Sequence, residues 1–231
     1  MNVLIVAAHP DDDVLGCGGA MDFWAAEGHF VHVHFAVDGE TSRGSGCESD
    51  RGQIESRNAA AHSVCKILGC KLVELLGLPG NRLDRLELLD VVQQFESIID
   101  RLRPEMVLTH HSGDVNIDHR IVHDAVLAVC RPQPKSPARE LLFLEVPFST
   151  EWRSPSSAMP FLPNYCVDIS VTLKIKFAAL DAYVSELWEF PHPRSLRAVE
   201  ALARWRGATV GVEAAEAFIL DRKLVSSQVK S

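Results

Sequence analysis

The sequence predicts an α/β domain with a mainly parallel sheet flanked by helices, followed by a C-terminal elaboration. Short runs rich in β-branched residues alternate along the chain with longer stretches whose apolar residues recur at helical spacing. This alternation is typical of βαβ units, in which the strands pair in parallel. With 231 residues, of which 47% are apolar, one such domain can bury a sizeable core without disulfides or structural metals.

The regular alternation occupies the core, at about 1–150. We expect strands at 3–8, 30–37, 72–76, 106–109 and 141–146. We expect helices at 14–27, 54–68, 86–102 and 120–130. Gly69 follows the second helix and suits the left-handed conformation in which many helices end. The glycine- and serine-rich stretch 38–47 is expected to be a loop.

Residues at about 151–225 are expected to add a C-terminal elaboration to this core. Core and elaboration together should form a single domain that spans 1–231. Most of the prolines fall between 131 and 163, so this stretch should be rich in loops. Beyond it we expect a weak strand at 167–171 and helices at 173–188 and 195–206.

The charge balance and the cysteines exclude several classes of protein. Asp and Glu outnumber Lys and Arg by 31 to 23, and the net charge of −8 argues against nonspecific binding of nucleic acid or anionic membranes. Six cysteines are scattered without a C-x-x-C pair, which excludes a zinc ribbon and suits free thiols in the cytoplasm. The apolar run at the N-terminus is too short for a signal peptide, and no run is long enough to span a membrane.

A histidine and three aspartates directly follow the first predicted strand, in the run His9-Pro-Asp-Asp-Asp13. Ligands of open α/β sheets bind at the carboxyl ends of the strands, where this run lies. Three adjacent carboxylates repel one another unless a cation, hydrogen bonds or water offset their charge. The run therefore suits a divalent metal, and it equally suits a solvated acidic loop at the start of a helix.

The glycines at 16, 18 and 19 resemble a dinucleotide-binding turn only in composition. The required G-x-G-x-x-G pattern is absent, and the neighbouring carboxylates would repel a pyrophosphate. We expect these glycines to let the first helix pack closely against the sheet.

A second polar run begins where the fourth predicted strand ends and contains His110, His111, Asp114, Asn116, Asp118 and His119. Its D-x-N-x-D spacing imitates a calcium-binding EF-hand loop, but Ala125 occupies the position that requires a bidentate glutamate. His119 and His123 are four residues apart and could bind one metal from a helix, although the H-E-x-x-H glutamate is replaced by Arg120. Since both polar runs lie at strand ends they can converge, and mixed His and Asp donors suit catalytic zinc.

The two runs resemble the motifs of the PIG-L/LmbE superfamily of zinc-dependent N-deacetylases. Ala8-His-Pro-Asp-Asp-Asp13 is similar to the first motif, (A)HPDD(E), and Asn116-Ile-Asp-His119 is similar to the second, H/N-x-D-H. Supporting similarity extends over 15–19, 57–69, 77–84 and 212–218. The resemblance implies a Rossmann-like domain that holds no dinucleotide, and a hydrolase that removes an N-acetyl group.

The resemblance also implies roles for individual residues. The zinc ligands would be His9, Asp12 and His119, and Asp11 would be the general base. Three protein ligands leave an open coordination position, and zinc lowers the pKa of water there. Asp11 would accept the proton of that water and pass it to the departing amine. Another divalent metal could replace zinc.

Two positions depart from the family pattern. Asp13 replaces the more usual glutamate, and Asn116 stands where many members carry a histidine. The Asn116 amide can donate a hydrogen bond to an oxyanion but cannot supply a proton. His110 or His111 could take over that role, or acid catalysis could rest on Asp11 alone.

Further candidates for contacts with sugar hydroxyls or a phosphate are Arg57, Asn81, Asp84, His192 and Arg194. Each of these residues could instead be a helix cap, a turn residue or a surface charge without a role in binding. Trp152 and Trp188 could stack on a sugar ring or pack in a core or interface. His32 and His34 alternate along a strand and should share one face of the sheet.

The leading hypothesis is a zinc-dependent hydrolase that acts on a small N-acetylated sugar, nucleotide sugar or glycoconjugate and could form a homo-oligomer. An amidase acting on a thiol-containing glycoside conjugate is an alternative within the family. A non-catalytic Rossmann-like nucleotide binder and a structural metal-binding protein are alternatives outside it. The loops at 38–50 and 131–163 should determine which substrate is bound. Their sequences contain no motif that identifies that substrate.

Overall fold

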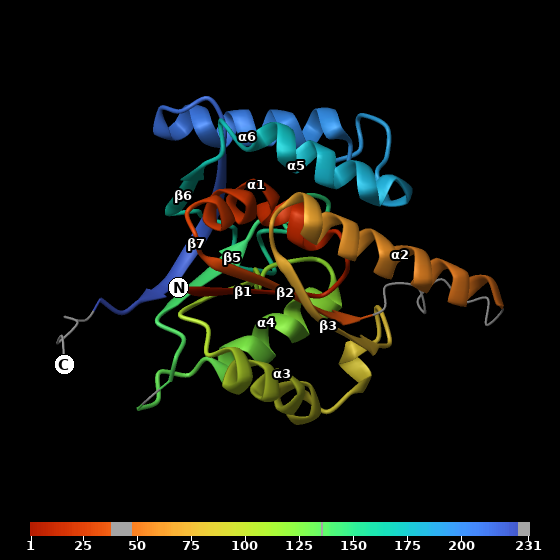
Figure 1. The fold of residues 1–231 in the computed structure, drawn as a ribbon, viewed down its shortest axis with the longest axis vertical. Helices are drawn as coiled ribbons and strands as arrows, with labels where there is room; N and C mark the ends of the chain where they lie inside the picture. Colours follow the sequence, from red (N-terminus) through yellow and green to blue (C-terminus); the bar gives the residue numbers. More distant parts are fainter. Residues whose placement is uncertain (38–47, 135, 226–231) are drawn as a thin grey trace.

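In the part of the chain that the structure describes, seven strands form one sheet in the order β3-β2-β1-β4-β5-β7-β6 (Figure 1). The structure, a computed structural model, describes residues 1–37, 48–134 and 136–225. The parallel strands are β1 (Asn2–Ala7), β2 (Phe30–Val37), β3 (Lys71–Leu78), β4 (Met106–His110) and β5 (Glu140–Leu144). The antiparallel strands are β7 (Ala215–Lys223), which pairs with β5, and β6 (Tyr165–Asp168), which pairs with β7.

Helices cover both faces of the sheet (Figure 1). One layer contains α1 (Asp12–Ala26), α2 (Glu48–Ile67), α5 (Leu173–Leu180) and α6 (Leu196–Val210). The other contains α3 (Leu88–Leu102) and α4 (Ile117–Val129). The described residues also include the short 3-10 segments η2 (Leu83–Arg85) and η3 (Asp181–Glu186). Successive side chains of a strand point to opposite faces, so Val3 and Ile5 of β1 join the core under the first layer, and Leu4 and Val6 join the core under the second.

The predicted elements of the N-terminal part are confirmed, with shifts at their ends. The structure places β2 at the predicted residues, and Gly69 after α2 has the expected left-handed φ of 65°. The predicted loop at 38–47 lies outside the described residues. The helix α4 begins three residues earlier than predicted because the Asn116 side chain accepts the N–H of Asp118 and caps it. Asp118 and His119 therefore lie in the first turn of a helix and not in a loop.

The C-terminal part differs more from the prediction. The predicted helix at 173–188 is α5 followed by η3, and the predicted strand at 167–171 is β6, which ends at Asp168. The sequence does not predict β7, because the charge of Glu216 interrupts the apolar pattern. The buried Glu216 carboxylate accepts the N–H groups of Gly19 and Ala20 and lies 2.6 Å from Nζ of Lys176 on α5. Tertiary packing thus supplies the partners that let a charged residue face inward.

The glycines of α1 have the packing role that the sequence predicts. A Cβ atom on Gly16 would lie 3.2 Å from the Cβ of Leu144, and one on Gly19 would lie 2.9 Å from the side chain of Ile169. The helix α1 therefore approaches β5 and the end of β6 more closely than a residue with a side chain would allow.

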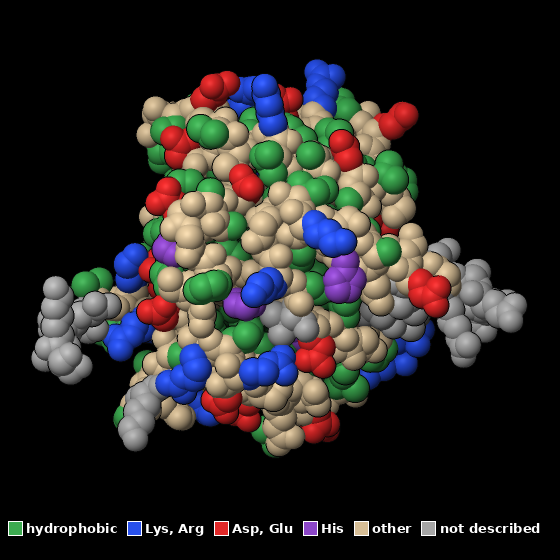
Figure 2. Space-filling model, viewed as in Figure 1, with side chains coloured by type: hydrophobic (Ala, Val, Ile, Leu, Met, Phe, Trp, Pro, Cys, Tyr) green, Lys and Arg blue, Asp and Glu red, His purple; other side chains and the backbone are tan. Residues whose placement is uncertain are grey.

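Surface charge, helix character and the state of the cysteines were also expectations from the sequence. Basic and acidic side chains are interspersed over the face shown in Figure 2. Within 1–37, 48–134 and 136–225, no helix combines the length and the apolar character that crossing a membrane requires. The cysteines of these residues are free thiols, and four of the five are buried.

Candidate active site

The two polar runs meet at the carboxyl edge of the sheet, where β1 and β4 lie side by side (Figure 1). From β1 the sheet continues through β2 in one direction, and from β4 it continues through β5 in the other. This change of direction is the position at which open α/β sheets bind their ligands. The loop after β1 carries His9 and Asp11, and the loop after β4 leads to Asn116 and α4.

His9, Asp12 and His119 come together as the sequence predicts. His9 Nδ1 and His119 Nε2 lie 3.1 and 3.2 Å from Oδ2 of Asp12. All three residues are buried, and one nitrogen or oxygen of each lies within 4.8 Å of the other two. Three donors at this spacing can share one ion at metal–ligand distances of about 2 Å.

The second ring nitrogen of each histidine faces another carboxylate. His9 Nε2 lies 3.1 Å from Oδ2 of Asp118, and His119 Nδ1 lies 2.7 Å from Oδ2 of Asp114. Asp118 also accepts the backbone N–H of Leu83 at 3.2 Å. A carboxylate behind a histidine fixes the orientation and tautomer of the ring, so the opposite nitrogen presents its lone pair to a metal.

The sequence analysis missed these roles of Asp114 and Asp118, which it noted only as part of an EF-hand-like spacing. Their position in the same short run as His119 is the signal that could have indicated them. Spacing along the chain does not show which aspartate faces which ring, because Asp118 serves His9, which is 109 residues away.

Charge in this cluster favours a cation. Burial opposes the protonated form of His119, but Asp12 and Asp114 raise its pKa to about 10. Burial likewise opposes the ionised form of Asp12, but His119 and His9 hold the pKa of Asp12 well below its usual value. Oδ1 of Asp12 and Nε2 of His119 are buried without a hydrogen-bond partner among the described residues. A divalent metal would supply the missing partner of both buried atoms, because it is bound by carboxylate oxygens and imidazole nitrogens.

Asp11 has an unusual backbone and a charged partner. Its φ of 119° lies in a region that residues other than glycine rarely adopt. Its side chain is buried, and Oδ2 lies 3.1 Å from Nη2 of Arg194. Burial raises the pKa of Asp11 to about 6, although Arg194 favours the ionised form. A buried carboxylate that titrates near neutral pH, next in the chain to a metal ligand, is suited to general base catalysis.

Arg57 and Arg194 share the buried carboxylate of Glu186. Arg194 Nη1 lies 3.2 Å from Oε2 of Glu186, and Arg57 Nη2 contacts Oε1. The sequence predicts that both arginines contact substrate, and that contact stays a prediction. Sequence reasoning missed Glu186, because only the packing of η3 against α2 brings it to Arg57.

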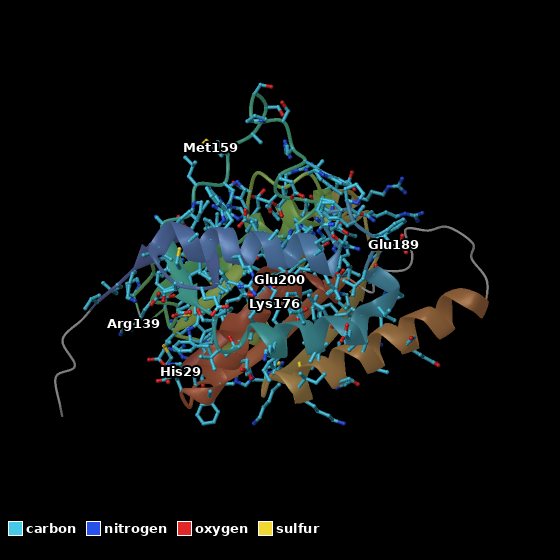
Figure 3. The ribbon with its side chains drawn as sticks, turned by 90° about the horizontal axis from the view of Figure 1, so that it is seen from above. His29, Arg139, Met159, Lys176, Glu189 and Glu200 are labelled. Carbon is cyan, nitrogen blue, oxygen red and sulfur yellow. The ribbon has the colours of Figure 1, made fainter. Side chains whose placement is uncertain are left out.

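His110 and His111 both lie at this edge of the sheet and are engaged by backbone groups. His110 Nε2 accepts the N–H of Ala8 at 2.7 Å, and burial together with His119 keeps the pKa of His110 well below its usual value. His110 is therefore neutral at physiological pH. His111 Nε2 lies 2.9 Å from the carbonyl oxygen of Met159, on the loop that projects from the body of the molecule in Figure 3.

His123 does not join the group around Asp12. Its Nδ1 lies 2.8 Å from the carbonyl oxygen of His110. His119 and His123 therefore do not form the metal-binding pair that their spacing allows.

Asn116 has both ends of its side chain occupied. Oδ1 accepts the N–H of Asp118 at 2.8 Å, and Nδ2 donates to Oδ1 of Asn81 at 3.2 Å. The sequence-predicted substrate residues Asn81 and Asp84 are both exposed, Asn81 beside this amide and Asp84 on η2. Their contact with a substrate stays a prediction.

A group of aromatic rings extends from Arg194 to two exposed tryptophans. His192 stacks on Trp188, with ring centroids 5.2 Å apart, and meets the edge of Trp152 at 5.6 Å. Trp152 in turn meets Phe148 at 6.0 Å, and the guanidinium carbon of Arg194 lies 3.8 Å from the centre of the Phe148 ring. Trp152 and Trp188 are 54% and 61% exposed, so neither is a core residue.

Comparison with known proteins identifies the family. The sequence model of the family described as PIG-L, GlcNAc-PI de-N-acetylase, matches residues 4–130. The chain is 30% identical over 189 residues to the uncharacterized deacetylase YaiS of Escherichia coli K12, which covers 79% of this chain and 90% of that protein. It is also 25% identical over 201 residues to the 4-oxalmesaconate hydratase of Pseudomonas putida. This match covers 82% of this chain and 76% of that protein.

A solved structure shares the whole fold. The crystal structure of a conserved protein from Thermus thermophilus matches with a TM-score of 0.74 and 26% identity, over 99% of this chain and 98% of that chain. More than half of the chain matches the family model, and that match contains both polar runs at the carboxyl edge of the sheet. The chain therefore belongs to the PIG-L, GlcNAc-PI de-N-acetylase, family.

Proposed function

We propose that this protein is a zinc-dependent hydrolase that removes an N-acetyl group from an amino sugar or a sugar conjugate, releasing acetate and a free amine. The observation that carries the proposal is the convergence of His9, Asp12 and His119, with a second carboxylate behind each histidine. The family description, which names removal of an N-acetyl group, supports the same reaction.

The metal would be held by Nδ1 of His9, a carboxylate oxygen of Asp12 and Nε2 of His119. Two imidazoles and one carboxylate are a donor set typical of catalytic zinc. When bound, zinc polarises a carbonyl group and lowers the pKa of water. Asp114 and Asp118 keep the two imidazole rings turned towards this point.

Asp11 is the proposed base. It accepts the proton of the attacking water and then delivers that proton to the departing amine. Arg194 contacts Oδ2 of Asp11, so Oδ1 is the oxygen that carries the proton. His110 is a poor acid because it is neutral and its Nε2 already accepts a hydrogen bond. Acid catalysis is therefore assigned to Asp11 in preference to His110, and His111, which contacts the carbonyl oxygen of Met159, stays the alternative that the sequence offers.

Asn116 stays the candidate donor to the oxyanion. Its Nδ2 carries two hydrogens, and the one that does not bind Oδ1 of Asn81 would donate to the oxyanion. An amide can donate this hydrogen bond while it supplies no proton.

The substrate is proposed to be a small molecule whose sugar contacts Asn81, Asp84 or His192, because Arg57 and Arg194 are held in buried ion pairs. The exposed rings of Trp152 and Trp188 would offer stacking surfaces for a second ring of a conjugate. The free cysteines support a cytoplasmic location. A homo-oligomer stays a prediction.

A screen for release of primary amine tests the reaction. The panel contains N-acetylated monosaccharides, nucleotide sugars and glycoconjugates, and zinc is measured in the same preparation. Amine and acetate should appear in equal amounts from at least one compound. A fully zinc-loaded protein that releases amine from none of them would contradict the proposal.

Other activities give different signals in the same preparation. Release of amine only from a thiol-containing glycoside conjugate would identify the amidase. Consumption of 4-oxalmesaconate, the substrate named for the Pseudomonas putida relative, would identify a hydratase. Bound nucleotide in a protein that does not bind zinc would identify a nucleotide binder.

A further inference from the structure

We propose that Arg194 is a positioning residue that orients the Asp11 carboxylate, and that Glu186 and Arg57 hold Arg194 for this task. The inference rests on the proposed function, in which Asp11 is the base. Its evidence is a buried chain of ion pairs that ends at Asp11.

Four side chains of alternating charge form this series of ion pairs. Arg57 contacts Glu186, Glu186 lies 3.2 Å from Arg194, and Arg194 lies 3.1 Å from Asp11. The exposed fraction of the side chain is 7% for Arg57 and 5% for Glu186. It is 11% for Arg194 and 3% for Asp11. Two guanidinium groups and two carboxylates sum to no net charge, which reduces the cost of burying them together.

Arg194 is restrained from several directions. Nη2 faces Asp11, Nη1 faces Glu186, and the ring of Phe148 lies 3.8 Å from the guanidinium carbon. The backbone N–H of Arg194 also donates to Nδ1 of His192 at 3.1 Å. A planar guanidinium that is held along two edges and one face has little freedom to rotate.

Distant segments build this arrangement. Asp11 follows β1, Arg57 lies on α2, Glu186 ends η3, and Arg194 precedes α6. Among the described residues, Arg194 is the one basic side chain within 4 Å of the Asp11 carboxylate. The direction of that carboxylate therefore depends on a residue that is 183 positions away in the sequence.

Asp11 needs such support because its backbone is strained. A non-glycine residue at a φ of 119° is strained, and this conformation persists only when its surroundings hold it. The carboxylate is also buried, so no bulk water stabilises it in another direction. The ion pair with Arg194 thus selects one orientation of the group that accepts the proton.

Direct contact with substrate is the competing role for Arg194. Both Nη atoms already face carboxylates, and the side chain is 11% exposed. A substrate contact should change KM, whereas a positioning role should change kcat, because a displaced base affects the chemical step more than the binding of substrate.

The zinc-loaded Arg194→Ala enzyme tests this distinction. We expect kcat to fall about 100-fold, with KM and zinc content within about twofold of the unmodified enzyme. Added guanidinium ion should restore part of kcat by occupying the vacated position, and Arg194→Lys should retain more kcat than Arg194→Ala. Arg197→Ala is the matched control, since Arg197 is exposed near the start of α6 and its guanidinium carbon lies 4.3 Å from the centre of the Phe190 ring.

A double variant tests the role of Glu186. If Glu186 acts through Arg194, Glu186→Gln should lower kcat, and Arg194→Ala with Glu186→Gln should be no slower than Arg194→Ala alone. Circular dichroism and zinc content of each variant confirm that the comparison is between folded, loaded enzymes.

Crystal structures of the zinc-loaded unmodified protein and Arg194→Ala give a readout that needs no substrate. The Asp11 carboxylate should turn or its backbone should relax in the variant. An unchanged Asp11, a rise in KM at constant kcat, or loss of zinc in parallel with kcat would each overturn the inference. Absence of amine release from the unmodified enzyme would refute the proposed function instead, and the crystallographic comparison would still decide the role of Arg194.

Discussion

Oδ2 of Asp114 lies 2.7 Å from Nδ1 of His119, on the side of the imidazole ring away from Asp12. Asp118 holds the same relation to His9. The two ligand histidines therefore approach the proposed metal with their rings already fixed. Neither of these two carboxylates is a proposed metal ligand, so their replacement tests the support of the rings.

Replacing either supporting carboxylate should weaken the metal site. We expect Asp114→Ala and Asp118→Ala to lower zinc affinity by about 10–100-fold, because each ring loses the partner that sets its orientation and tautomer. Competition with a chromogenic chelator measures the affinity. Asp124→Ala is the control, since Asp124 is exposed on the same helix as Asp118. Equal affinities in all three variants would show that the rings need no such support.

Asp11→Asn should separate metal binding from catalysis. The amide is close in size to the carboxylate but cannot accept the proton of water, so amine release should fall by about 10²–10⁴-fold. Zinc content should be unchanged, because Asp11 is not a proposed ligand. Asp90→Asn, at an exposed position on α3, should behave like the unmodified enzyme. Retained activity in Asp11→Asn would move the base to another residue.

Zinc should stabilise the folded protein. A ligand that binds only the folded state adds about 2.7 kcal/mol to the free energy of unfolding when its free concentration is 100 times Kd. Removal of metal with a chelator should therefore lower Tm, and zinc should restore it. The Tm of Asp12→Ala should not respond to zinc, because one ligand is missing. Calorimetry in metal-buffered solutions measures both effects.

His34 should make stability depend on pH. Its side chain is fully buried on β2 against Phe95, and burial with the nearby charge of Arg101 lowers its pKa to about 4. The unfolded chain binds a proton below about pH 6.5, whereas the folded protein does not until about pH 4. The neutral His34 therefore contributes its full stability above pH 6.5, and up to about 3 kcal/mol is lost as the pH falls to 4.

Urea unfolding from pH 7 to 4 measures this contribution. His34→Leu should show a shallower loss of unfolding free energy than the unmodified protein over this range. The variant His62→Gln, at an exposed position on α2, should retain the original slope. Identical slopes in all three proteins would show that His34 is not the group that titrates.

The pair of Lys176 and Glu216 should be a stability determinant outside the candidate site. Lys176→Met leaves the Glu216 carboxylate buried with only its two backbone donors, and breaking a buried pair in this way costs about 3–5 kcal/mol. Chemical denaturation measures the cost. Lys174→Met, at an exposed position of the same helix, should change the unfolding free energy by less than about 0.5 kcal/mol.

Local sequence determined the framework of this protein. The alternation of strand and helix periods depends on neighbouring residues, and it gives the parallel core and the strand ends at which the two polar runs lie. Because carboxyl ends of adjacent parallel strands meet at one edge, the sequence predicts that the two polar runs converge. The choice of His9, Asp12 and His119 within these runs came from their resemblance to the family motifs, and the structure places one nitrogen or oxygen of each within 4.8 Å of the others.

Tertiary structure alone decided which charges meet inside the protein. A buried carboxylate requires a partner, and packing selects that partner from the whole chain. Nothing in the local sequence indicates that Arg194 faces Asp11, that Asp118 serves His9, or that Lys176 lets β7 carry a buried glutamate. The ligands of the proposed metal are thus readable from short motifs, whereas the residues that orient them are set by contacts between segments far apart in the sequence.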